Sequence, residues 1–103
     1  MKVIIVIVSY NSAEDLPECL TSVKNLLTTN YSLLTIVVDN SSDDNSVDVA
    51  KKFDVEVIEN SENLGFSGGA NVGIKATQKF GANFILLLNP DTTVHPSLIY
   101  EFL

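Results

Sequence analysis

The polar residues that end the apolar run 84–88 are of types that bind a cation or a sugar hydroxyl. Asn89, Pro90 and Asp91 follow five consecutive apolar residues. Pro90 fixes its own backbone and disfavours a helical conformation at Asn89, so the chain must leave any regular element there. The carboxylate of Asp91 is then presented where that element ends. The same residues also suit a plain turn, and this segment alone favours neither interpretation.

Two other apolar runs end in polar residues in the same way. These residues are Ser9, Tyr10 and Asn11 after the run 3–8, and Asp39 and Asn40 after the run 35–38. A carboxylate such as Asp39 is able to accept two hydrogen bonds from a nucleobase or a ribose, and Tyr10 is able to stack on a ring. Asp91 is suited to Mg²⁺ or Mn²⁺, because both metals prefer oxygen ligands.

Residues 63–73 are rich in glycine, which permits either sharp turns or close backbone approach to a ligand. We expect a loop here, including Gly68, that exposes backbone amides to a diphosphate. The spacing is not that of the dinucleotide-binding fingerprint, and no Gly-Lys-Ser or Gly-Lys-Thr of a phosphate loop occurs. A helix should follow through Ala76 and Phe80, with Gly81 ending it.

The elements that must position these residues alternate between strand and helix. Unbroken apolar runs predict buried parallel strands at 3–8 and 84–88, and shorter ones predict strands at 35–38 and 55–58. An apolar stripe from Leu16 to Leu27, preceded by Asp15 as a cap, predicts the first helix. A second helix should carry residues 47–53, and a last one should begin near 97.

This alternation predicts an α/β fold: a Rossmann-like, mainly parallel sheet of strand order 3-2-1-4, with helices on both faces. In that order the first and fourth strands are neighbours, and the crossover direction reverses between them. Ligands of open α/β sheets bind beside such a switch point, at the carboxyl ends of the strands. The three polar strand ends would border one crevice there, suited to a nucleoside diphosphate and a metal ion.

Composition narrows the class of protein. The 103 residues, 46% hydrophobic and 18% charged, suit one globular domain, and a formal charge of −7 argues against nucleic acid as a partner. Cys19 is the only cysteine, which excludes an internal disulfide and favours a reducing compartment, so we expect a cytoplasmic protein. The run 3–8 is too short for a signal peptide or a membrane span.

Four ordered motifs make the sequence resemble the nucleotide-sugar-binding half of a family 2 glycosyltransferase of the GT-A fold, over essentially the whole chain. The motifs are Val-Ser-Tyr-Asn at 8–11, Val-Val-Asp-Asn-Ser-Ser at 37–42, Asn-Leu-Gly-Phe-Ser-Gly-Gly-Ala-Asn-Val-Gly at 63–73, and Leu-Leu-Asn-Pro-Asp at 87–91. The resemblance implies transfer of a sugar from a nucleoside diphosphate to a glycan or lipid-linked acceptor with inversion, in polysaccharide synthesis, at the inner face of the membrane if the longer protein is associated with one.

The resemblance also implies roles for individual residues. Ser9 and Tyr10 would line the nucleotide pocket, Asp39 would contact the base, and Asn71 would lie near the nucleotide. Asp91 matches the last acid of the family's Asp-x-Asp metal motif, but Asn89 stands where many members have an aspartate, which weakens the expected hold on Mg²⁺ or Mn²⁺.

The Asn-Pro-Asp sequence is similar to the rhamnosyltransferase and galactofuranosyltransferase branch, which implies a dTDP- or UDP-linked donor. The family's acceptor half and catalytic base would lie beyond residue 103. The chain is therefore expected to be a truncated piece that transfers nothing alone and self-associates through apolar surface left uncovered.

Two other classes remain open from the residues alone. A phosphoacceptor receiver module has a similar size and sheet, but it needs acids at the end of the first strand, where Ser9, Tyr10 and Asn11 stand. A dinucleotide-binding domain is disfavoured by the missing fingerprint. Labelling by acetyl phosphate would favour the first, and tight NAD binding would favour the second.

Overall fold

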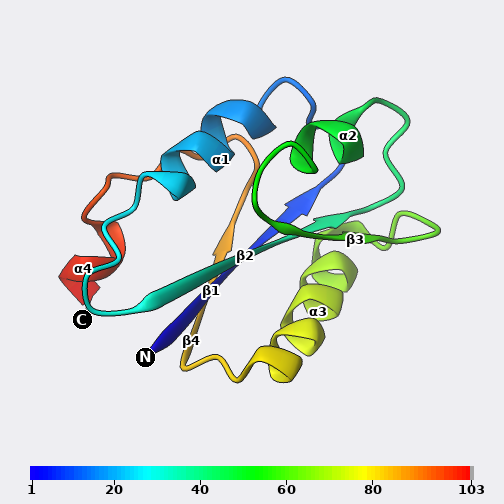
Figure 1. Ribbon diagram of the computed structural model, residues 1–103. Helices are drawn as coiled ribbons and strands as arrows, with labels where there is room; N and C mark the ends of the chain where they lie inside the picture. Colours follow the sequence, from blue (N-terminus) through cyan, green and yellow to red (C-terminus); the bar gives the residue numbers. More distant parts are fainter. Residues whose placement is uncertain (103) are drawn as a thin grey trace.

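Four parallel strands form one sheet in the order β3-β2-β1-β4, as the sequence predicts. The computed structural model describes residues 1–102 (Figure 1). The strands are β1 (Lys2–Ser9), β2 (Ser32–Asp39), β3 (Glu56–Glu59) and β4 (Phe84–Leu88). β1 is central because its residues are apolar on both faces and nearly all buried, which suits a strand covered by helices on both sides.

The register of the strands places their polar ends at one edge of the sheet. Ser9 pairs with Asp39 across β1 and β2, and Asp39 pairs with Glu59 across β2 and β3. On the other side of β1, Leu88 pairs with Ile7. The loops after β1, β2 and β4 therefore all leave from the same edge.

Helices cover both faces of the sheet, as Figure 1 shows. α1 (Leu16–Lys24), α2 (Ser46–Ala50) and α4 (Leu98–Phe102) lie on one face, while α3 (Gly65–Thr77) and the short 3₁₀ helix η1 (Gln78–Phe80) lie on the other. Alternate residues of β1 face opposite layers, so Ile5 and Ile7 pack in the larger cluster under α1, whereas Ile4 and Val6 pack under α3.

The prediction of a loop over residues 63–73 is wrong, because most of this segment belongs to the helix α3. Gly65 begins the helix with a positive φ of 73°, and Gly69 and Gly73 lie inside it. A Cβ on Gly73 would lie 2.4 Å from Val6 Cγ1, and one on Gly69 would lie 2.7 Å from Val8 Cγ1. These two glycines thus let α3 approach the sheet more closely than any side chain would allow.

Three smaller expectations about helices also fail. α1 ends at Lys24, and Leu27, expected on its apolar face, is 51% exposed. Asp15 precedes α1 but makes no side-chain capping hydrogen bond. α2 ends at Ala50, before Phe53, because the chain must turn there to enter β3. Gly81 does end the helical segment, with a left-handed φ of 68°.

The two edge strands of the sheet differ in polarity. β3 carries Glu56 and Glu59, which discourage pairing with another strand. β4 has no charged residue, and Phe84, Ile85 and Leu87 are 54%, 41% and 40% exposed. Within residues 1–102, every helix is too short or too polar for a membrane span.

Candidate functional site

Asp39 ends β2 and faces the side of the sheet covered by α1 and α2. It is only 2% exposed, and both carboxylate oxygens accept hydrogen bonds from Ser42. The backbone N–H of Ser42 donates to Oδ2 over 2.9 Å, and the Ser42 hydroxyl donates to Oδ1 over 2.6 Å. Each oxygen keeps a second acceptor position, so the carboxylate is held in place but not saturated.

Asn11 ties the loop after β1 to the loop after β2. Its backbone N–H donates to the hydroxyl of Ser42 over 2.8 Å, and its side-chain Oδ1 accepts the N–H of Asp43 over 2.8 Å. Asn11 and Ser41 both have a positive φ, 48° and 61°. Such conformations persist in residues other than glycine when surrounding contacts hold them. The side chain of Asn11 thus serves as a link between the loops.

A second link joins the same two loops through Asp44 and Ser46. Asp44 accepts hydrogen bonds from the N–H and hydroxyl of Ser46 and, over 3.2 Å, from the N–H of Ala13. The buried hydroxyl of Ser46 accepts the N–H of Ser12 over 2.8 Å. The hydrogen bond from the Ser46 hydroxyl is the main cause that lowers the pKa of Asp44. The two loops therefore behave as one polar unit.

Asn40 follows Asp39 but points to the opposite face of the sheet, toward α3. It is 2% exposed, its Nδ2 donates to the carbonyl of Gly65 over 3.0 Å, and its Oδ1 accepts from Asn60 over 2.9 Å. Asn40 thus links the start of α3 to the end of β2 through hydrogen bonds of its side chain. Both ends of its amide are engaged within the protein.

Ser9 and Tyr10 end β1 in different environments. The hydroxyl of Ser9 is fully buried and has no hydrogen-bond partner among the residues described, which is uncommon for a buried polar atom. Tyr10 is 46% exposed, so its ring is available for stacking. The backbone carbonyl of Ser9 accepts the N–H of Asn40 over 2.8 Å.

Asn89 and Asp91 are exposed and lie beside α1, after the end of β4. The thiol of Cys19, on the buried face of α1, contacts the carbonyl of Asn89 with a distance of 3.9 Å. The pKa of Cys19 is raised from 9.0 to about 11, mainly by burial and to a smaller extent by the negative charges of Asp91 and Asp15. Cys19 is therefore an unreactive core thiol, and the effect of Asp91 on its pKa indicates that Asp91 lies near α1.

Gly68 and Asn71 both lie on α3 rather than on a loop. Gly68 is half-buried in the helix, and Asn71 is exposed. Because Asn40 holds Gly65, the amino end of α3 is fixed beside the carboxyl end of β2. The N–H of Gly65 donates to Asn63 Oδ1 over 2.8 Å, and the next N–H groups in the first turn lack intrahelical partners, as at any helix start. Such free N–H groups attract anions.

The metal expected at Asp91 is only partly supported by the residues present. Among residues 1–102, no group of three or more His, Cys, Asp or Glu side chains is placed to hold a metal ion. Asp91 is a single exposed carboxylate with the neutral Asn89 two residues before it. One carboxylate suits Mg²⁺ or Mn²⁺ only where a phosphate-bearing ligand supplies further oxygens.

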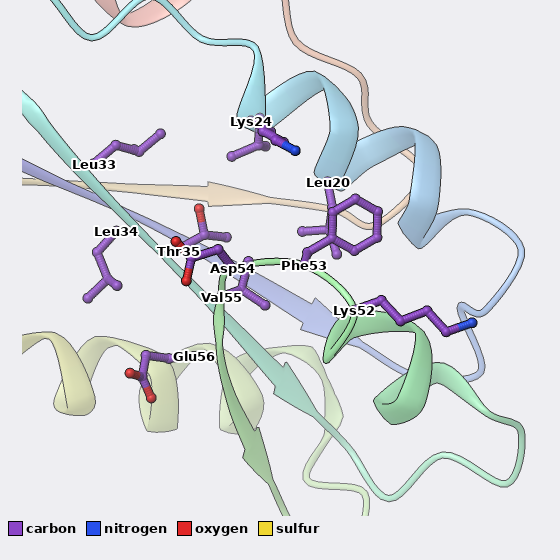
Figure 2. Close-up of a pocket in the computed structure, with 11 residues that line it drawn as sticks. Leu20, Lys24, Leu33, Leu34, Thr35, Lys52, Phe53, Asp54, Val55 and Glu56 are labelled. Carbon is purple, nitrogen blue, oxygen red and sulfur yellow. The ribbon is translucent and has the colours of Figure 1, made fainter.

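A cavity of about 610 Å³ lies away from this edge of the sheet (Figure 2). It is lined by α1 and the first half of β2, including Leu20, Leu33 and Thr35, and by Phe53 and neighbours that lead into β3. Since Leu33 is the second residue of β2 and Asp39 is the last, the cavity lies toward the opposite end of the strands. It contains none of the residues expected at the site.

The structure brings Asn11 and Asp39 together through one hydrogen-bond network. Ser9 pairs with Asp39 in the sheet, but its hydroxyl lies outside that network. Asp91 lies at the same edge on the same side of the sheet, and within the described part of the chain no hydrogen bond joins it to Asp39. The sequence reasoning missed the linking residues Ser42 and Ser46. The spacings Asp-x-x-Ser and Asp-x-Ser, typical of side-chain-to-backbone turns, were the available signal.

The fold agrees with the family of proteins to which this chain is similar. Residues 4–103 match the family model described as glycosyl transferase family 2. The low-salt glycan biosynthesis hexosyltransferase Agl10 of Haloferax volcanii is 34% identical over an alignment of 103 positions that covers 94% of this chain and 30% of that protein.

Solved structures share the fold. S. aureus TarS 1–349 in complex with UDP superposes with a TM-score of 0.84 at 23% identity, over 99% of this chain and 31% of that one. The mannosyltransferase PcManGT from Pyrobaculum calidifontis, in complex with GDP-Man and Mn²⁺, gives a TM-score of 0.77 at 18% identity, over 94% and 30%. The expected Rossmann-like GT-A fold is confirmed, and the chain spans less than a third of each of these proteins.

Proposed function

Because this chain belongs to glycosyl transferase family 2, we propose that it forms the part of a sugar-transferring enzyme that binds the nucleoside diphosphate sugar. The longer enzyme would transfer the sugar to a glycan or lipid-linked acceptor with inversion. Family membership decides against the receiver module and the dinucleotide-binding domain. The acceptor half and the catalytic base would come from residues outside this chain.

The observation that carries the proposal is the polar network at the carboxyl edge of the sheet. It holds the carboxylate of Asp39 at the end of β2, with the exposed ring of Tyr10 at the end of the neighbouring strand. A carboxylate and an aromatic ring at adjacent strand ends suit a nucleoside, through hydrogen bonds and stacking. The amino end of α3 at the same edge suits the diphosphate.

Asp91 is proposed as the protein ligand of a divalent cation shared with the diphosphate. Such a cation would neutralise charge on the diphosphate and, in a protein of net charge −7, offset the repulsion of an anionic ligand. The support is that the structure of PcManGT is a complex with GDP-Man and Mn²⁺, and that a lone carboxylate suits a metal completed by phosphate oxygens. We expect no tight Mn²⁺ binding without nucleotide.

The donor is proposed to be a UDP- or dTDP-linked hexose. The support is mixed, because the structure of TarS is a complex with UDP-GlcNAc, whereas that of PcManGT is a complex with GDP-Man. Transfer of a rhamnosyl group rests only on the Asn89-Pro90-Asp91 sequence. Competition among UDP, dTDP and GDP tests the base preference, and a clear preference for GDP would contradict the proposal.

Calorimetric titration of UDP and dTDP, with and without Mn²⁺, tests the proposal on this chain. Asp39→Ala should weaken nucleotide binding in both conditions, whereas Asp91→Ala should remove only the gain from Mn²⁺. Asp54→Ala, an exposed acid lining the cavity at the far end of β2, is the matched control and should bind like the wild type. Equal affinities in all four proteins would refute the site.

A further inference from the structure

One hydroxyl joins the two loops at the proposed nucleotide site. Ser42 Oγ accepts the backbone N–H of Asn11 over 2.8 Å and donates its own proton to Asp39 Oδ1 over 2.6 Å. A hydroxyl has one donor and can accept as well, so this serine fills both roles at once. Among the described residues, no other side chain donates a hydrogen bond to the carboxylate of Asp39.

The hydroxyl fixes the rotation of the carboxylate. With both Ser42 bonds in place, one acceptor position on each oxygen of Asp39 is used and the other two point in fixed directions. Without the hydroxyl, only the backbone N–H of Ser42 remains, and one bond leaves the carboxylate free to turn. Torsions of this type, between tetrahedral and planar carbons, have broad energy minima, so packing alone defines them poorly.

The same hydroxyl also holds the spacing between Tyr10 and Asp39. Asn11 follows Tyr10 and has a left-handed backbone, with its N–H directed at Ser42. Loss of the hydroxyl would leave that N–H without its partner and loosen the loop that carries Tyr10.

We infer that Ser42 is a positioning residue, which orients Asp39 for the nucleoside and sets its distance from Tyr10 without contacting the ligand itself. This inference rests on the proposed nucleotide site. It assigns a function to a residue that would otherwise be seen only as part of a turn.

The first test is calorimetric titration of UDP into the 103-residue chain and three variants, with thermal unfolding of each. Ser42→Ala should weaken UDP binding roughly tenfold, the loss typical of one hydrogen bond to a charged group. Ser42→Thr keeps the hydroxyl and should restore the affinity to within about threefold of the wild type. Thr28→Ala removes an exposed hydroxyl in the loop before β2, at the other end of the strands, and should leave the UDP affinity unchanged.

A double-mutant cycle separates positioning from a general effect on folding. In the Asp39→Ala background, Ser42→Ala should cause a clearly smaller further loss of UDP affinity than in the wild type, because there is no carboxylate left to orient and only the tie to the Tyr10 loop remains. A full additional loss in that background, or wild-type affinity in Ser42→Ala alone, overturns the inference while the nucleotide site stands. Absence of UDP binding by the wild type, with or without Mn²⁺, overturns both.

Discussion

Gly73 is the position where the close approach of α3 to the sheet is most directly tested. A Cβ added there would lie 2.4 Å from Val6 Cγ1 and 3.1 Å from Val38 Cγ2, well inside the 3.5–4.0 Å at which carbon atoms attract. Helix propensity alone favours alanine over glycine by about 1 kcal/mol. Overpacking a core costs about 1–3 kcal/mol, and a contact of 2.4 Å belongs to the upper part of that range. After the gain in helix propensity is subtracted, we expect Gly73→Ala to be destabilising by about 1–2 kcal/mol.

Thermal and urea unfolding provide the measurement. A loss of this size should lower the melting temperature by roughly 5–15 °C in a domain of this length. Lys75→Ala, at an exposed position of the same helix, is the matched control and should change stability by less than about 0.5 kcal/mol. If Gly73→Ala were as stable as the wild type, α3 would be able to shift away from Val6 at no cost, and the close packing would not require glycine at this position.

A second variant tests whether the clash is with Val6 itself. Val6→Ala removes the methyl groups that a Cβ at Gly73 would meet, so the two substitutions should be coupled. We expect the double variant to lose about 1 kcal/mol less than the sum of the two single losses. Strict additivity would mean that the two residues do not compete for the same space.

Three further predictions concern other features of the chain. The pKa of Cys19 rises from 9.0 to about 11 on folding, so the stability that comes from its protonated thiol is fully present below pH 9 and is lost as the pH rises to 11. In urea unfolding between these two pH values, the wild type should lose about 2 kcal/mol more of its free energy of unfolding than Cys19→Ala. Equal losses in the two proteins would contradict the raised pKa. We propose that the uncharged edge strand β4 pairs with β4 of a second copy of this chain. Sedimentation should show dimers whose affinity increases with salt and which are absent in Leu87→Lys. A wild type that stays monomeric at high concentration would refute this. Gly81→Ala should destabilise by about 1–2 kcal/mol because φ is 68°, and Gly81→Asn by less, as thermal unfolding would show; equal losses would argue against a conformational cause.

The strands could be predicted well because their signal is local and strong. The strand 84–88 matches β4 at both ends, since Pro90 and the polar residues around it leave no other place for the strand to stop. β2 begins at Ser32, three residues before the predicted start, because Ser32 pairs with Lys2 of β1. Pairing with a neighbour extends a strand beyond its own apolar residues, and a single segment carries no sign of this.

The helix α3 could not be predicted at its start, because glycine has a low intrinsic helix propensity. The helix forms there because Gly69 and Gly73 allow close contact with Val8, Val6 and Val38, which lie 35 to 67 positions earlier in the chain and so leave no local pattern.

The site was predictable in place but not in detail. Parallel strands must end at one edge, so Ser9 and Asp39 were expected to meet there, and their pairing confirms it. The link through Ser42 depends on left-handed backbones at Asn11 and Ser41, which residue types alone do not specify.

The central place of β1 in the sheet has a consequence for how the protein is made. β1 leaves the ribosome before either of its neighbours in the sheet, and Phe84, which pairs with Val3, is synthesised about eighty residues later. At typical translation rates this delay is roughly 4–16 seconds. Throughout that time a run of valine and isoleucine has one bare hydrogen-bonding edge, so the nascent chain is the form of this protein most prone to aggregate and most in need of a chaperone.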